Sequence, residues 1–184
     1  SLAVKNNGTI WSWGQNNFGQ LGDGTTTQKI IPVQVSSLMG MTAVAAGRYH
    51  SLALKNDGTV WGWGFNSDGE LGNGTTTNSS TPVQVSSLTG INAIEAGGIL
   101  SIYSGHSLAV KNDATLWALG YNLYGQLGDG TSATRTTPVQ ILTGVIAAAA
   151  ADYSSLALQN DGTVWSWGWN YYGQLGDGTT IGKS

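Results

Sequence analysis

Large and small side chains alternate along short segments of this chain, and the same alternation returns in four copies. The clearest examples are residues 51–55 (SLALK) and 59–64 (TVWGWG). A period of two with β-branched and aromatic residues predicts β-strands. Asn-Asp-Gly joins the two segments, and Gly58 suits the left-handed position of a tight hairpin because it has no Cβ. The third copy has Ala114 at this position, which predicts a strained turn.

The copies begin at Ser1, Ser51, Ser107 and Ser155, so their spacings are 50, 56 and 48 residues. A period near fifty with strand-like content predicts a propeller or another stacked array. We therefore interpret the chain as a single array, residues 1–184, in which the last repeat is incomplete. The expected repeats are 1–50, 51–106, 107–154 and 155–184.

Two further strands are expected in each complete copy, for example at 82–85 (PVQV) and 92–96 (NAIEA). The proline that opens the first of them donates no amide hydrogen, which favours the outer edge of a sheet. Residues 145–151 have helical propensity, but their register matches an expected strand at 42–46. Each repeat thus supplies four strands, the content of one propeller blade.

Blades that pack face to face need two buried surfaces. We expect Leu, Val and Trp on one face of the blade and Ala, Ser and Gly on the other, so that large residues fill the space beside small ones. This assigns the paired tryptophans to the core between blades, with a sugar-stacking platform as the alternative. The pairs are Trp11/Trp13, Trp61/Trp63 and Trp165/Trp167.

The charge and the cysteine content limit the classes of partner that the chain is expected to bind. Seven Lys and Arg against ten Asp and Glu give a net charge of −3, which is no footprint for a nucleic acid. The absence of cysteine excludes disulfides, and no apolar run is long enough for membrane insertion. The low charge and the Thr, Ser and Asn content are typical of secreted bacterial proteins, so an extracellular or cell-surface location is expected. Because the chain begins and ends inside a repeat, we expect a piece of a longer array.

The string AGxxHSLALKNDGTVWxWGxNxxGQLGDGTxxxxxxPVQV, carried almost without gaps, resembles the regulator of chromosome condensation repeat family. The resemblance covers essentially the whole chain. It implies an all-β fold, a β-propeller that usually has seven blades of four strands, and a rigid disc that binds other proteins through its loops. About three and a half repeats are present here, so the propeller is partial or is completed by an oligomer.

Known activities of the family fit this chain poorly. The family that the chain resembles includes a nucleotide exchange factor that binds nucleosomes, a plant ultraviolet-B photoreceptor and a secreted inhibitor of β-lactamases. Arg48 and Arg135 are the only arginines for nucleosome binding. The photoreceptor's Gly-Trp-Arg-His motif has its nearest counterpart at 47–50 (GRYH), which lacks the tryptophan.

An open arc exposes blade faces and strand edges that invite another chain. Four hairpins and three further strand pairs give fourteen strands, and two chains would supply the twenty-eight of a seven-bladed ring. The two kinds of pair do not divide evenly over seven blades, however. We expect either a homo-oligomer or completion by further repeats.

Functional residues are expected where the copies differ. About six extra residues precede the third copy, and Ile99, Leu100, Ile102 and Tyr103 make this insertion apolar. It is either a contact loop for a protein partner or a lid packed over its own disc. A second variable strip follows each WG and is rich in aromatic residues. These could bind protein, bind glycans or cap the seam between blades; they are Phe18, Phe65, Tyr121, Tyr124, Trp169, Tyr171 and Tyr172.

No catalytic, cofactor or metal constellation is recognisable. His50 and His106 share one repeat position and are interpreted as structural. The recurrent Asp-Gly pairs are explained by turns. Glu70, Glu95 and Asp152 are each unique to their copies, but nothing pairs them with a nucleophile. The sequence predicts a non-enzymatic scaffold for protein–protein interaction or self-assembly, with a glycan-binding module as the alternative.

Overall fold

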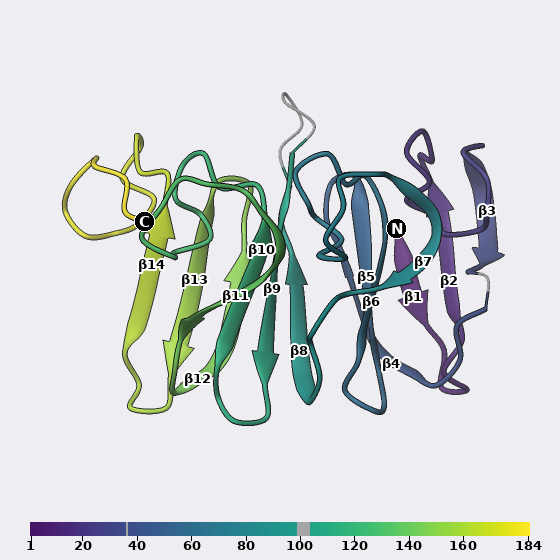
Figure 1. Ribbon diagram of the computed structural model, residues 1–184, viewed down its shortest axis with the longest axis horizontal. Coiled ribbons are helices and arrows are strands. Elements are labelled where there is room, and N and C mark those ends of the chain that lie inside the picture. Colours follow the sequence, from purple (N-terminus) through teal and green to yellow (C-terminus); the bar gives the residue numbers. More distant parts are fainter. Residues whose placement is uncertain (36, 99–103) are drawn as a thin grey trace.

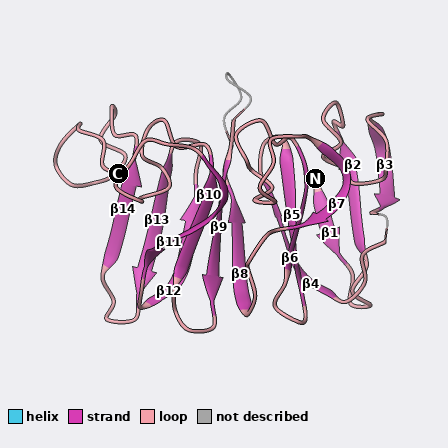
Figure 2. Ribbon diagram, in the orientation of Figure 1, coloured by secondary structure: helices cyan, strands magenta, loops and turns pink. Residues whose placement is uncertain are grey.

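The computed structural model describes residues 1–35, 37–98 and 104–184 and contains fourteen β-strands. They form four antiparallel sheets that stand side by side, in chain order from one end of the molecule to the other (Figure 1). The described residues form strands, turns and loops, and include no helix long and apolar enough to cross a membrane (Figure 2). The expected all-β architecture of propeller blades is confirmed.

The first sheet consists of β1 (Leu2–Val4), β2 (Ile10–Gly14) and β3 (Lys29–Gln34). The second consists of β4 (Met41–Ala46), β5 (His50–Lys55), β6 (Val60–Gly64) and β7 (Ser79–Gln84). The third consists of β8 (Ile91–Ala96), β9 (His106–Lys111), β10 (Leu116–Gly120) and β11 (Arg135–Leu142). The fourth consists of β12 (Val145–Ala150), β13 (Ser154–Gln159) and β14 (Val164–Gly168).

Strand order within each sheet follows the chain. β8 lies beside both β4 and β12, and the three form the inner side of the arc, whereas β3, β7 and β11 each hold a proline and lie at an outer edge. The sheets are out of phase with the sequence repeats, because the inner strand at the end of one repeat pairs with the hairpin of the next. Among the described residues, the first sheet therefore consists of β1, β2 and β3 alone, without a strand at the inner position. In the last sheet, the outer position holds one bridge between Gly168 and Lys183.

The hairpin turns have the expected left-handed residue. Gly8, Gly58 and Gly162 have φ of 76°, 79° and 87°. Ala114 adopts the same conformation at 61°, so the third hairpin keeps the turn geometry without the glycine that suits it. The strand at 145–150, expected from register rather than propensity, is confirmed as β12.

The expected division into one face of large residues and one of small residues is wrong. In the β5–β6 hairpin, Leu52 lies opposite Gly62 and Ala53 lies opposite Trp61. Each face of the sheet therefore mixes sizes. We call the face that carries Leu52 the forward face, since it packs on the following sheet, and the face that carries Trp61 the backward face.

The hydrophobic core lies between the sheets. Leu52 and Val60 on the forward face of the second sheet form one buried cluster with Ala109 and Leu119 of the third sheet. Equivalent clusters fill the other two seams. Trp63 is fully buried and Trp167 is 6% exposed, so both are core residues as expected from the sequence. Trp165, in contrast, is 52% exposed.

Candidate interaction surface

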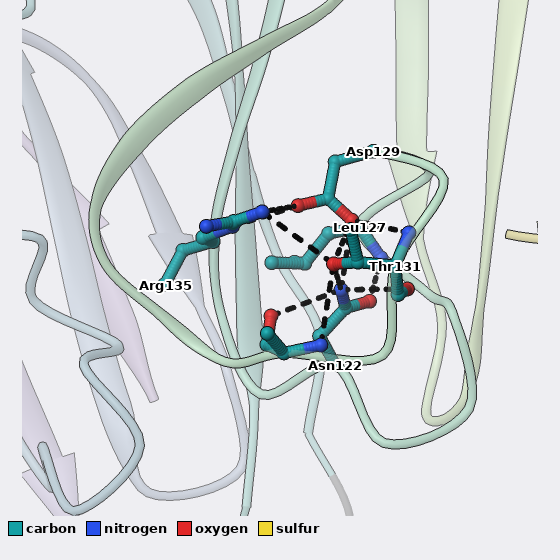
Figure 3. Close-up of polar contacts among 6 residues, drawn as sticks. Asn122, Leu127, Asp129, Thr131 and Arg135 are labelled. Atoms are coloured by element: carbon teal, nitrogen blue, oxygen red, sulfur yellow. Dashed lines mark hydrogen bonds and ion pairs between the residues drawn. The ribbon is translucent and has the colours of Figure 1, made fainter.

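An asparagine organises the long loop that follows the second strand of each hairpin. In the third sheet, the Asn122 Nδ2 group donates to Asp129 Oδ1 (3.0 Å) and to the carbonyl oxygens of Thr131 and Ala133 (both 3.1 Å). Asn122 Oδ1 accepts the Leu127 amide at 2.9 Å (Figure 3). One side chain thus ties three parts of the loop together. Its counterparts make the same kind of bonds and are equally buried: Asn16, Asn66 and Asn170.

Asp129 fixes the turn that the sequence analysis explained by geometry alone. Its Oδ1 accepts the Thr131 amide (3.0 Å) and hydroxyl (2.7 Å), while Arg135 Nε donates to Oδ2 at 2.7 Å (Figure 3). Burial alone would raise the pKa of Asp129, but the hydrogen bonds from Thr131 and Arg135 outweigh it and hold the pKa below its usual range. The turn is therefore clamped to the outer strand.

This clamp varies in a coordinated way. Lys29 pairs with Asp23 and Lys183 with Asp177, both at 3.5 Å. In the second sheet, the two positions are Asn73 and Ser79, so both charges are replaced together. The loop itself is unchanged there, because Asn73 Oδ1 still accepts the Thr75 amide and hydroxyl.

A backbone carbonyl in each of the first three loops joins one sheet to the next. The Gln20 carbonyl accepts Ser51 Oγ at 2.9 Å and Trp63 Nε1 at 3.0 Å, both from the second sheet. The Gln126 carbonyl accepts Ser155 Oγ (2.7 Å) and Trp167 Nε1 (2.9 Å) in the same way. At the middle seam, between the second and third sheets, the Glu70 carbonyl accepts Ser107 Oγ at 3.2 Å. Leu119 stands there in place of the tryptophan.

The two histidines belong to these joints. His50 Nε2 lies 3.0 Å from Ser107 Oγ, and because that hydroxyl donates to the Glu70 carbonyl, Nε2 is the donor. His106 Nε2 lies 2.9 Å from Ser155 Oγ in the next seam. Burial lowers the pKa of His50 to about 4 and that of His106 to about 3, so both are neutral at pH 7. This geometry is structural, as the sequence analysis expected.

Aromatic rings of two neighbouring sheets meet at the first and the last seam. Phe18 of the first sheet's loop meets Tyr49 and Phe65 of the second at centroid distances of 5.3 and 4.9 Å. Tyr124 meets Tyr153 at 5.1 Å in the same way at the last seam. These contacts favour the seam-capping interpretation for Phe18, Phe65, Tyr124 and Trp169, which itself packs on Tyr153.

At the middle seam, Tyr121 is the counterpart of Phe65 and Trp169, but the other two aromatic positions differ. Asp68 stands where the other seams have Phe18 or Tyr124, and its Oδ2 accepts Ser104 Oγ at 2.9 Å. Gly105 stands in the place of Tyr49 and Tyr153. The expected contact residues of the insertion, Ile99, Leu100, Ile102 and Tyr103, lie outside the described residues.

Of the remaining predicted site residues, Tyr121 is buried while Tyr171 and Tyr172 are 66% and 78% exposed. Tyr171 belongs to a row that composition did not single out. The residue directly after each organising asparagine is exposed in all four loops, and these residues are Asn17, Ser67, Leu123 and Tyr171. We call these four positions the loop row. Aligning the copies on the asparagine would have found it, whereas the aromatic signal pointed to neighbouring positions.

The buried acid Glu70 is the most perturbed carboxyl group. It occupies the position of Gln20 and Gln126, and its Oε2 accepts the Asp68 amide at 2.9 Å, as Gln126 Oε1 accepts the Tyr124 amide. Burial raises the pKa of Glu70 to about 8. A protonated Glu70 is close in shape to glutamine, which makes a structural role sufficient. The described residues hold no group of three or more His, Asp or Glu positioned for a metal ion.

Antiparallel sheets packed face to face, each joined to the next through a loop carbonyl, define this chain as an arc of β-propeller blades. The Regulator of chromosome condensation (RCC1) repeat matches residues 7–54, 57–110 and 113–158, and a second form of the same repeat matches 41–70 and 145–174. The chain belongs to this family.

Known proteins that are similar to this chain are longer than it is. The ultraviolet-B receptor UVR8 of Arabidopsis thaliana is 33% identical over 146 residues, which are 77% of this chain and 32% of the receptor. The E3 ubiquitin-protein ligase HERC2 of Homo sapiens is 46% identical over 52 residues, 27% of this chain and 1% of the ligase.

Human WBSCR16 superimposes with a TM-score of 0.82 at 25% identity, and yeast RCC1 (Prp20) with 0.85 at 21%. Each comparison covers all of this chain but 47% and 44% of the respective structure. The chain therefore spans less than half the length of these relatives.

Proposed function

We propose that this chain is a non-enzymatic scaffold that binds another protein through the loop row, and that self-association or further repeats complete its ring. The carrying observation is the contrast within each loop. A fully buried asparagine fixes the backbone, and the next side chain is exposed and differs from copy to copy. A rigid frame that displays variable side chains suits recognition, since little entropy is lost when it binds.

The row changes character along the arc. Asn17 and Ser67 are polar, whereas Leu123 is 59% and Tyr171 66% exposed. An exposed tyrosine is typical of the anchoring part of a protein interface. The yeast structures support this class of function: Prp20 is bound to Kap60 in one of them and has binding properties to Gsp1p and histones, which are properties of that protein.

A photo-crosslinking residue at position 171 tests the proposal in cells of the natural host. We expect a discrete adduct with one protein, and the same adduct from position 123. Position 39 is the control, because Met39 is 60% exposed but lies outside the loop row. Equal labelling from positions 39 and 171 would contradict a protein-binding row.

The proposed partner is not a nucleic acid, because the basic side chains are engaged within the chain. Five basic residues form ion pairs with aspartates, and these are Lys29, Lys55, Lys111, Lys183 and Arg135. Lys5 lies 3.9 Å from the centroid of the Trp11 ring, and Arg48 5.6 Å from that of Tyr49. A cell-surface or secreted location remains part of the proposal, and fractionation of the natural host with an antibody tests it.

A glycan ligand is the second candidate, favoured by the stacked pair Trp169 and Tyr171, whose ring planes lie 9° apart. Exposed aromatic rings of this kind suit the apolar faces of sugars. A glycan array probed with the wild-type chain and with Tyr171→Ala separates the two. Binding that is lost in the variant would support the glycan, and an empty array would remove it.

A further inference from the structure

The forward face of the last sheet is a packing surface without a partner. Leu156 and Val164 are 44% and 68% exposed, yet their counterparts Leu52 and Val60 in the second sheet are 2% and 1% exposed. Leu156, Leu158 and Val164 line an apolar hollow together with alanines of β12. In the two interior sheets, the next sheet fills this place. The internal copies thus show what covers such a face.

A slot for one tryptophan is part of this surface. A Cβ added to Gly22 would lie 2.8 Å from Trp63 Nε1, and one added to Gly128 would lie 2.6 Å from Trp167 Nε1. Glycine at this position therefore makes room for the tryptophan of the next sheet. The counterpart in the last sheet is Gly176, beside which no atom of the described residues lies within 4 Å.

The carbonyl that would accept the indole N–H is also present. Gln20 and Gln126 use their carbonyl oxygens for Trp63 and Trp167, and Gln174 occupies the same position in the last loop. Its side chain already adopts the interior arrangement, since Oε1 accepts the Tyr172 amide at 3.0 Å. The acceptor half of a sheet-to-sheet joint is therefore preformed.

The first sheet carries the donor half. Trp13 is the counterpart of Trp63 and Trp167, and it is half-buried on the backward face, where this chain provides no sheet for its indole to enter. Ile30 on β3 is 87% exposed, whereas its counterpart Ser80 packs on Gly19: a Cβ added to that glycine would lie 2.5 Å from Ser80 Cα. The matching glycine of the last sheet is Gly173.

We propose that a second copy of this chain docks head to tail, with its Trp13 in the slot at Gly176 and its indole N–H donated to the Gln174 carbonyl. Its Ile30 would then lie against Gly173. The proposal deepens the self-association named above and rests on it. Because the two faces differ, the contact is heterologous, and it gives a ring or an open chain of copies according to its rotation.

Sedimentation of the 184-residue chain over a dilution series measures the assembly. We expect a mass at least twice that of one chain, and loss of the assembly in both Trp13→Asp and Val164→Asp. Ile146→Asp is the control. Ile146 is 57% exposed on the inner strand β12, where the counterparts Thr42 and Asn92 are polar. Circular dichroism checks that every variant keeps its strands.

Mixing separates head-to-tail docking from a symmetric contact. Trp13→Asp keeps its last sheet intact and Val164→Asp keeps its first sheet, so a mixture of the two should form a 1:1 complex although each alone is a monomer. Trp13→Leu should weaken the assembly less, because Leu119 fills the same position at the middle seam. A wild-type monomer at every concentration, or no complex in the mixture, would overturn the proposal. Cross-linking at position 171 in the monomeric variants tests whether the loop row binds a protein partner, independently of self-association.

Discussion

At the scale of single residues, a few buried polar groups hold the loops in place. Asn122 satisfies both its amide hydrogens and its oxygen with loop partners and is completely buried. A buried polar group that loses its partners costs about 1–3 kcal/mol. Two residues are strained in other ways, since Ala114 has a left-handed backbone and Glu70 is a buried acid.

Ala114→Gly should stabilise the chain. The residue has φ of 61°, a conformation that costs an L-residue about 1–2 kcal/mol and costs glycine nothing comparable. Glycine also loses more entropy on folding, so the expected net gain in the free energy of unfolding is about 1 kcal/mol or slightly less. Urea unfolding measures it.

The matched control is Gly58→Ala, which should destabilise the chain by more than Ala114→Gly stabilises it. An added Cβ there meets the Gly90 nitrogen at 2.8 Å in addition to the strain at φ of 79°. If Ala114→Gly left the midpoint unchanged, the strain assigned to this turn would be wrong.

Glu70→Gln should change how stability depends on pH. The pKa of Glu70 is about 8 when folded and 4.5 when unfolded, so the unfolded chain loses this proton first as pH rises. The wild-type free energy of unfolding should therefore fall between these pH values, by roughly 1.4 kcal/mol for each unit of separation. The variant should lack that fall, as urea unfolding on both sides of the window would show.

The two histidines act in the opposite direction and at lower pH. Their folded pKa values lie below 6.5, so stability falls as pH drops from 6.5 toward about 4 and 3. Comparing Glu70→Gln with the wild type at each pH cancels this contribution. Gln126→Glu is a second check, because it should introduce a new fall at high pH. Parallel curves for the wild type and Glu70→Gln would refute the assignment.

At the scale of elements, an ion pair closes the long loop of every sheet except the second, and in the first and third sheets it ties the loop to the outer strand. Arg135 and Asp129 approach to 2.6 Å, and the carboxylate side chain is only 3% exposed. Asn73 and Ser79 replace such a pair together. The paired replacement indicates that a carboxylate here is useful only with its cation.

Introducing the pair should therefore be cooperative. The double variant Asn73→Asp with Ser79→Lys should be more stable than the effects of the two single variants predict when added, by about 0.2–1 kcal/mol, the range for an exposed pair. A double-mutant cycle by thermal unfolding at low and high salt measures this coupling. A coupling that persists unchanged in high salt would argue against an electrostatic clamp.

At the scale of the whole molecule, the three seams are unequal. The outer two have a tryptophan N–H and a serine hydroxyl on one carbonyl, whereas the middle seam has the serine alone at 3.2 Å. Among the described residues, rings of both neighbouring sheets meet at the outer seams, whereas Asp68 and Gly105 replace two of the three rings at the middle seam. The middle seam therefore lacks the tryptophan hydrogen bond of the other two.

Leu119→Trp should strengthen that seam. The indole N–H can reach the Glu70 carbonyl, and a hydrogen bond of this kind contributes about 0.5–1.5 kcal/mol. Hydrogen exchange of the β9 and β10 amides should slow relative to the wild type. Gly72 leaves room for the side chain at position 119, since a Cβ added to Gly72 would lie 2.8 Å from a methyl carbon of Leu119. Trp63→Leu is the converse control, and faster exchange in Leu119→Trp would indicate overpacking instead.

Much of this structure could be predicted from the sequence, because each copy of the repeat has the same turn residues and the same alternation of side chains. The hairpin glycines, the outer-edge prolines and the strand at 145–150 follow from backbone geometry and register. The role of the histidines followed from their shared position. The division of side chains between faces was predicted wrongly, because the hairpin register that places Ala53 opposite Trp61 is set by the folded turn.

The loop row and the joints depended on tertiary structure. Nothing in the local pattern shows that Gln20 gives its carbonyl to Trp63, 43 residues later, or that Tyr171 stays exposed while Tyr121 is buried. Alternation and turn chemistry act between near neighbours, so the sequence by itself determined the strands, their repeat and the family. Which faces of a sheet are buried depends on contacts between sheets that are distant in the chain. Only the packing of the sheets decided that Leu52 is buried while the equivalent Leu156 is 44% exposed.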